Sequence, residues 1–298
     1  MRHPLSDLRE AGFTLVEVII VIAITGIVGA IVAVFIRVPV QNYADSVARA
    51  EVSDEADLAL RRMARELRVA LPNSVRVNAD GSAIEFLLTT TGGRYLAPED
   101  NQPATVPVLD FVDPAKKTLT VIGTLTRTVN AGDYFVVYNL GNDMAPADAW
   151  GLRTADRNIA RISTTVAAGT QPAVLTLDDN PFAIQSVSMP SPQQRFQIVS
   201  GPVTFACARA ADGALVLTRY AGYEINVSQV NPPPNASAAP LSRRVGSCAG
   251  IFSYDAAGSA QRTALVSIAL ELATRAAPGS PAAVPVRMVY QVHMDNTP

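Results

Sequence analysis

The sequence predicts an α+β protein in which one long N-terminal helix packs on a β-rich, mainly antiparallel globular body. Three observations support this fold class. A long apolar run occupies residues 13–36, an amphipathic helical pattern follows it, and short apolar segments separated by Pro and Gly fill the rest. The chain has 298 residues, of which 49% are hydrophobic. This is enough material for one large core or two modest ones.

The composition excludes some classes of function. Charged residues make up 17% of the chain and the formal net charge is -2, so the sequence has no basic footprint for nucleic acid. The chain contains 21 Pro and 18 Gly with few aromatic residues. That balance predicts many turns and favours a β-rich body over a helical bundle.

The N-terminus carries the strongest signal. Residues 1–12 form a short polar segment that ends in Gly12. The apolar run that follows is interrupted by Thr14, Glu17 and Thr25. As a helix this run would be about 36 Å long. A hydrocarbon core is about 30 Å thick, so residues 13–36 are long enough to cross a membrane.

Three interpretations of this segment compete. A secretory signal peptide has a shorter apolar region and a small-residue cleavage site, which this run lacks. A plain signal anchor fits the length, but it does not explain a carboxylate that costs roughly 2–3 kcal/mol within a membrane helix. If the chain is cut between Gly12 and Phe13, Glu17 becomes the fifth mature residue. Its carboxylate can then pair with the new α-amine of a neighbouring subunit.

Small residues recur in the apolar run at spacings of three and four. They are Gly26, Gly29, Ala30 and Ala33, together with Thr25. Such a stripe allows two helices to approach closely and predicts helix packing in an assembly. The alternative is that these are ordinary small residues of a membrane span.

A second helical stretch is predicted over residues 41–71, because apolar residues recur every three or four positions. The stripe consists of Val52, Ala56, Leu60, Met63, Leu67 and Leu71. The other faces are rich in charged residues, and Pro72 is expected to stop the helix. We therefore expect the apolar stripe to pack on a sheet and the charged faces to contact water.

The remainder predicts strands. The candidates are residues 83–89, 106–112, 118–129, 134–140, 160–166, 173–177, 195–198, 203–208, 214–219, 251–254, 264–272 and 284–293. A hairpin turn is expected at Ala211–Gly213. The proline-rich segment 231–240 is expected to be a loop outside any sheet. Trp150, in the irregular segment 140–158, is expected to be buried, with a role in binding as the alternative.

No constellation of catalytic residues is apparent. The two histidines are His3, in the polar leader, and His293, in a predicted strand, and neither cysteine has a C-x-x-C partner. We therefore expect no enzyme activity, no metal and no cofactor. If the chain is exported, Cys207 and Cys248 are expected to form one disulfide. The alternative is two buried reduced thiols.

The residues G-F-T-L-V-E-V at Gly12–Val18, followed by a long apolar helix, resemble the type IV prepilin signature. The resemblance implies that a membrane-embedded prepilin peptidase cuts after Gly12 and methylates Phe13. It also implies that Glu17 is needed for assembly. The implied fold is pilin-like, with 1–12 as leader peptide, 13–36 as transmembrane and assembly helix, 37–71 as amphipathic helix and 72–298 as periplasmic body.

Two further stretches, Ala59–Val77 and Met288–Pro298, resemble the MshO type of minor pilin, from the mannose-sensitive haemagglutinin pilus system and related to the PilW-like group. The resemblance implies a minor pilin in pilus assembly initiation or at the tip. Its implied partners are other minor and major pilins, the prepilin peptidase, the inner membrane and the pilus assembly platform, with no nucleic acid. The body would lie in the periplasm, or at the cell surface once incorporated.

Two other functions stay open. One is a minor pseudopilin of a type II secretion system, similar to the large J-type subunit. The other is a membrane-anchored adhesin or binding module whose loops grip a surface. An exposed apolar or aromatic patch around Trp150 would support the adhesin.

Overall fold

The computed structural model describes residues 12–255, 263–274 and 285–297. The predicted leader, apart from Gly12, lies outside the described residues. The chain forms two compact units, one of residues 1–51 with 276–282 and one of residues 52–275 with 283–298. We describe each unit by itself.

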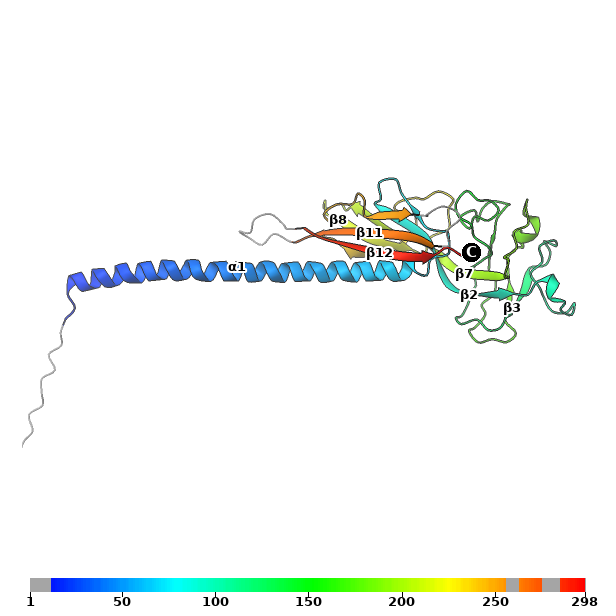
Figure 1. Ribbon diagram of the computed structural model, residues 1–298, viewed down its shortest axis with the longest axis horizontal. Coiled ribbons are helices and arrows are strands. Elements are labelled where there is room, and N and C mark those ends of the chain that lie inside the picture. The colour runs from blue at the N-terminus through cyan, green and yellow to red at the C-terminus, as the bar shows by residue number, and fades with distance from the viewer. Residues whose placement is uncertain (1–11, 256–262, 275–284, 298) are drawn as a thin grey trace, which may run out of the picture. The chain divides into compact units, whose positions relative to one another are not determined.

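One helix, α1 (Leu15–Leu67), occupies the N-terminal region and continues through Pro39 (blue in Figure 1). Its first part, Leu15–Ile36, has a mean hydropathy of 3.1, and none of it is buried. Within the described part of the chain it is the one helix long and apolar enough to cross a membrane. It therefore fits a single-pass membrane anchor.

The helix ends four residues earlier than the predicted end at Leu71. The backbone N–H of Leu71 donates to the carbonyl of Leu87 at 2.8 Å, and the N–H of Thr89 donates to the carbonyl of Val69 at 3.0 Å. The chain thus leaves the α-helix after Leu67, passes through a last turn in which Arg68 N–H still donates to the Ala64 carbonyl, and then pairs with a strand of the body. Pro72 lies beyond this change and is not what stops the helix.

The described residues of the body form two antiparallel sheets and two short 3-10 helices. The strands are β1 (Arg76–Val77), β2 (Ala83–Tyr95), β3 (Thr118–Ile122), β4 (Tyr134–Val136), β5 (Ile159–Arg161), β6 (Val174–Thr176), β7 (Arg195–Arg209), β8 (Leu215–Ala221), β9 (Ser237–Ser242), β10 (Phe252–Asp255), β11 (Thr263–Ala273) and β12 (Pro285–Asp295). The 3-10 helices are η1 (Pro98–Asp100) and η2 (Pro181–Ile184). Within the described residues, the larger sheet has nine strands. Six follow the path β5-β4-β7-β2-β3-β6, β1 lies beside β2, β8 lies beside β7, and β9 lies beside β8. The smaller sheet is β10-β11-β12 (Figure 1). This α+β arrangement confirms the predicted fold class.

Most predicted strands are present, but two predictions were wrong. The segment 231–240 was expected to stay outside any sheet. Its last residues belong to β9, where Pro240 pairs with Thr218 of β8. Proline is tolerated there because β9 is an edge strand beside a register shift. Residues 106–112 form no strand. Val106 closes a turn onto Pro103, and Pro107 has no backbone N–H to donate.

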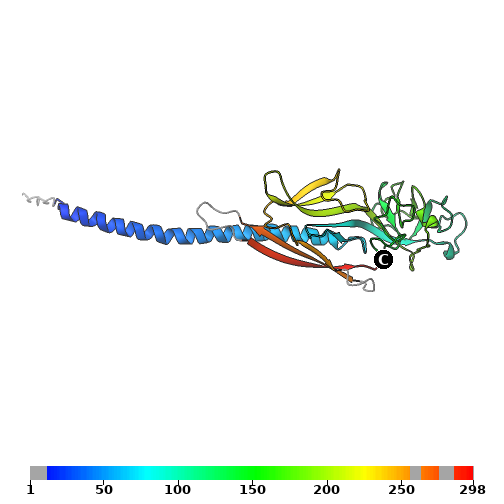
Figure 2. The same cartoon turned by 90° about the horizontal axis from the view of Figure 1, so that it is seen from above.

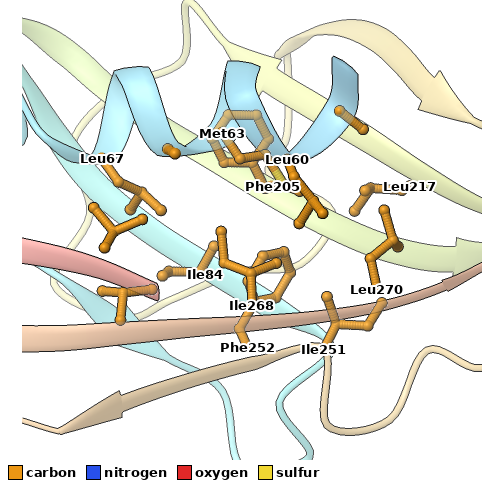
Figure 3. Close-up of a cluster of buried hydrophobic side chains, with 14 of the residues drawn as sticks. Leu60, Met63, Leu67, Ile84, Phe205, Leu217, Ile251, Phe252, Ile268 and Leu270 are labelled. Atoms are coloured by element: carbon orange, nitrogen blue, oxygen red, sulfur yellow. The ribbon is translucent and has the colours of Figure 1, made fainter. Parts of the chain in front are cut away.

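The main core lies where the last turns of α1 meet both sheets. In Figure 2 these turns run between the yellow-green strands of the large sheet and the orange and red strands of the small one. The buried helix residues are Val52, Ala56, Ala59, Leu60, Met63, Ala64 and Leu67. Figure 3 shows Leu60 and Met63 facing Phe205 of β7 and Ile268 of β11. The predicted stripe therefore contacts two sheets, where sequence analysis expected one.

A second core consists mainly of residues from the part of the chain between β2 and β7. Its aromatic rings form a chain in which Phe135 stacks on Phe196 at 4.9 Å and meets Phe182 edge-on at 5.8 Å. A third cluster contains Trp150, which is 1% exposed and donates its Nε1–H to the carbonyl of Ser74 at 3.1 Å. The expectation that Trp150 is buried is therefore confirmed.

Three asparagines connect the end of the chain to the region just after α1. The side chain of Asn73 donates to the carbonyls of Asn139 at 2.9 Å and Asn296 at 3.2 Å, and its backbone N–H donates to Oδ1 of Asn296 at 3.2 Å. Asn139 in turn donates to the carbonyl of Pro72 at 2.7 Å. We call Asn73, Asn139 and Asn296 the asparagine clasp. It holds the extreme C-terminus in place.

Two leucines of α1 test how much the helix stripe contributes. Leu60 is 1% exposed and Leu58 is 72% exposed. We expect Leu60→Ala to lower the free energy of unfolding by about 2–5 kcal/mol, because it leaves a cavity between the sheets. Leu58→Ala, the matched control, should change it by less than about 0.5 kcal/mol. Denaturant unfolding of the full chain in detergent measures both, and equal effects would contradict this packing.

Candidate processing and assembly site

The residues predicted for cleavage lie just outside the helix. Gly12, Phe13 and Thr14 have no regular secondary structure, and Phe13 is 80% exposed. A Cβ built on Gly12 would meet no atom within 4 Å. The peptide bond between Gly12 and Phe13 therefore lies outside regular secondary structure and is not covered by the described residues, as access by a protease requires.

Thr14 caps the helix. Its Oγ1 accepts a hydrogen bond from the backbone N–H of Glu17 at 3.2 Å, and its carbonyl accepts one from Val18 at 3.2 Å. This is the N-cap arrangement, in which a side-chain oxygen satisfies a donor that has no partner within the helix. The sequence T-x-x-E at Thr14–Glu17 is also the pattern of a capping box.

Glu17 lies in the first turn of α1, where a negative charge interacts favourably with the helix dipole. Its side chain is exposed, and within the described residues it has no ion-pair partner. A carboxylate that starts an apolar span of this length is costly in lipid unless a cation compensates it. Within the described residues, no cation lies beside Glu17 to provide this compensation.

The small residues predicted for helix packing lie exposed along α1. A Cβ built on Gly26 or Gly29 would meet no atom within 4 Å, and Ala30 and Ala33 are exposed as well. The hydroxyl of Thr25 donates to the carbonyl of Val21 at 2.7 Å, so this polar group is satisfied within the helix. The surface is smooth and apolar, which suits the close approach of a second helix.

The two cysteines are joined in a disulfide. Cys207 lies in β7 and Cys248 lies before β10, with their Cα atoms 5.3 Å apart and a separation of 41 positions in sequence. The bridge therefore ties the large sheet to the segment that leads into the small sheet.

A buried charge network, which no sequence pattern had predicted, lies beside Trp150. The Nε of Arg76 donates to Oε2 of Glu85 at 2.6 Å, and the guanidinium lies 3.7 Å from the centre of the Trp150 ring. Arg76 also donates to the carbonyls of Asn226 and Val227. The hydroxyl of Tyr223 donates to Oε1 of Glu85 at 2.8 Å, and burial raises the pKa of that tyrosine. The one sequence feature that pointed to the pair of Arg76 and Glu85 was Glu85 itself, a charged residue in the mainly apolar predicted strand 83–89.

A cleft of about 440 Å³ opens beside this network. Glu85, Tyr223 and Ile225 lie among its lining residues, with Pro233 and Pro234 from the connection between β8 and β9. The two oxygens of Glu85 already accept bonds from Arg76 and Tyr223. Within the described ranges, no three His, Cys, Asp or Glu side chains gather closely enough to hold a metal ion.

Comparison with known proteins gives a match for one segment of the chain. Residues 7–33 match the family model described as the prokaryotic N-terminal methylation motif. No curated protein and no solved structure matches the chain. The match covers Gly12, Phe13 and Glu17, and it ends inside the apolar part of α1.

The cap at Thr14 can be tested by amide hydrogen exchange. We expect Thr14→Val to speed exchange at the Glu17 amide by about fivefold, the effect of losing roughly 1 kcal/mol of cap stability. Thr14→Ser keeps the hydroxyl and should exchange like the wild type. Equal rates in all three proteins would show that Thr14 does not cap α1.

The disulfide gives a second prediction. A chain with Cys207→Ala and Cys248→Ala should lose up to about 4 kcal/mol of unfolding free energy, because a closed loop of this length restricts the unfolded chain. Denaturant unfolding of the full chain measures the change. Wild-type protein treated with reductant is the control and should shift in the same direction. An unchanged midpoint would contradict a stabilising bridge.

Proposed function

We propose that this chain, whose N-terminus is that of a type IV prepilin-like protein, is a minor pilin of an MSHA-like type IV pilus. The observation that carries the proposal is the set of residues at the start of α1. A scissile Gly12–Phe13 bond lies outside the helix, Glu17 lies in the first turn, and an exposed apolar helix follows. In this proposal the protein assembles and carries out no catalysis.

The proposed sequence of events follows from these groups. Prepilin peptidase cuts after Gly12, and Phe13 becomes a methylated N-terminus. The new α-amine of one subunit then neutralises the Glu17 carboxylate of the next, which removes the cost of a lone charge in an apolar environment. The stripe of Gly26, Gly29 and their neighbours lets the helices pack closely.

The proposed location also follows from the helix. The segment Leu15–Ile36 anchors the chain in the inner membrane, and the β-rich body, residues 72–298, lies in the periplasm. The disulfide fits an oxidising compartment. The partners are other minor and major pilins and the assembly platform, and the resemblance of Ala59–Val77 and Met288–Pro298 to the MshO type favours a role in initiation or at the tip.

The methylation motif also fits a J-type pseudopilin of a type II secretion system, because it belongs to the N-terminus and not to the body. The adhesin alternative was tied to an exposed patch around Trp150, and that side chain is buried. We therefore propose the minor pilin and use the identity of the co-purified subunits to separate it from the pseudopilin.

Mass spectrometry of the N-terminal peptide tests the processing step. Protein extracted from membranes that contain prepilin peptidase should yield an N-methylated peptide that starts at Phe13. Membranes without the peptidase should yield a chain that starts at Met1. A chain that stays uncut in both, or a cut beyond Ile36, would overturn the proposed function.

Charge removal at Glu17 tests the assembly step. We expect Glu17→Gln to reduce recovery of other pilin-like subunits to background, because the neighbouring α-amine loses its counter-charge. Glu51→Gln removes the same charge from α1 outside the apolar span and is the matched control. Pull-down from membranes that contain cleaved protein measures both. Full recovery with Glu17→Gln would count against assembly through this carboxylate.

A further inference from the structure

The open edge of β12 differs from the other sheet edges in the described part of the chain. The edge strands β1, β5, β6 and β10 have two to four residues each. The fifth, β9, has six residues, contains Pro240 and pairs through a register shift. By contrast, β12 has 11 residues and pairs with β11 in continuous register along its whole length. Proteins usually protect long edges by shortening, proline or bulges.

The hydrogen bonds of β11 show which backbone groups of β12 face outward. The N–H of Ala269 donates to the carbonyl of Ile251, and the carbonyl of Glu271 accepts from the N–H of Gly246. The backbone N–H and C=O groups of Ala269 and Glu271 are therefore directed away from β12. Because the direction of the backbone N–H and C=O groups alternates along a strand, those of Ile268 and Leu270 are directed toward β12. Their partners there are Tyr290 and Met288.

The intervening residues of β12 therefore direct their backbone groups to the open edge. These are Arg287, Val289, Gln291 and His293. Apart from the ladder with β11, no backbone hydrogen bond joins these four residues to another described segment. The edge thus presents a row of free donors and acceptors, the template to which an extended chain can add.

The side chains of β12 indicate that the sheet is incomplete on this side. Val292 and Met294 are buried in the main core, whereas Val286, Met288 and Tyr290 on the same face are half-buried. On the other face Val289 is 62% exposed. An added strand would cover both sets, because side chains of neighbouring strands lie against each other on each face.

Arginines outnumber carboxylates around the edge, where Glu271 lies opposite Arg287 and Asp295 ends the strand. Arg287 lies on the strand, and Arg68 donates from beyond the end of α1 to the hydroxyl of Tyr290 at 3.0 Å. Arg65, one turn earlier on the same helix face, is exposed. A second copy of β12 would bring one Arg287 and one Asp295 and so add no net complementary charge, whereas an incoming strand with several carboxylates would meet these arginines favourably.

We propose that the β12 edge binds an extended segment of a partner protein, which adds as a further strand of the small sheet and carries acidic side chains among apolar ones. This deepens the proposed function, on which it rests, because it says how the body of the subunit would hold a neighbour in the assembly. The contact uses backbone hydrogen bonds for affinity and the arginines for selectivity.

The variant Val289→Pro blocks this edge selectively. Proline removes an N–H that points outward and leaves the ladder with β11 intact, and edge strands tolerate proline at such positions. Val289→Thr keeps the N–H and the β-branched shape and is the matched control. Gln291→Pro blocks the same edge at the next outward position, in case Val289→Pro does not fold.

The probe is a synthetic peptide of about eight alternating valine and glutamate residues, long enough to pair with most of the edge. It is titrated into the full chain in detergent, beside a valine–lysine peptide and an acidic peptide with N-methylated amides. We expect the acidic peptide to bind wild type and Val289→Thr alike. Binding should be about tenfold weaker with either proline variant or with N-methylated amides, the effect of one or two lost hydrogen bonds.

Three results would overturn the proposal. They are equal binding by a folded proline variant, equal binding of the N-methylated peptide, and self-association of the wild type that Val289→Pro abolishes. The third would identify the occupant as a second copy of the chain. Hydrogen exchange gives an independent measure, because the peptide should slow the Val289 and Gln291 amides and leave the Tyr290 amide unchanged.

The experiment separates this inference from the proposed function. Glu17→Gln should lose assembly yet bind the peptide normally, and Val289→Pro should be cut after Gly12 normally. If the N-terminus is never processed but the peptide still binds, the proposed function fails alone. If processing and assembly through Glu17 hold while the peptide fails to bind, the strand addition fails alone.

Discussion

The packing of the last turns of α1 against both sheets is the interaction on which the rest of the body depends. The buried stripe from Val52 to Leu67 shares one core with residues of both sheets. The same helix begins as a segment that buries nothing within its own unit. One element therefore serves two environments, and its sequence changes from apolar on every side to apolar on one stripe accordingly.

This division explains why the polar residues at the start of α1 are informative. In an apolar segment every polar group must be satisfied or compensated. Thr14 and Thr25 form hydrogen bonds inside the helix, whereas the Glu17 carboxylate has no ion-pair partner within the described residues. Glu17 therefore still requires a positive partner, and in the proposed function the α-amine of a neighbouring subunit is that partner. The body satisfies its own buried charge differently, by pairing Glu85 with Arg76 against the ring of Trp150.

Sequence patterns predicted the elements with strong periodicity and failed where tertiary pairing decided the outcome. The apolar run, the stripe through Leu60 and Met63, and the alternating strand β11 each have a period that specifies one conformation. The end of α1 depends on a bond between Leu71 and Leu87, and β9 depends on its place at an edge, so neither could be deduced locally. The residues of the candidate site were predicted from a short local motif. The network around Arg76 joins residues up to 151 positions apart, so no local pattern could reveal it.

The asparagine clasp has a consequence for the order of biogenesis. Asn296, the third residue from the end of the chain, bonds to Asn73 directly after α1, and β12 completes the small sheet that covers the helix stripe. Synthesis makes residues 52–67 well before residues 285–297, so a growing chain holds the helix stripe before it holds this part of the cover. Until β12 is in place, the stripe from Val52 to Leu67 lacks part of its cover, and exposed apolar surface of this kind promotes association with other chains. Folding of the body therefore waits on β12, because a chain cut before Pro285 would lack both this strand and the Asn296 side of the clasp.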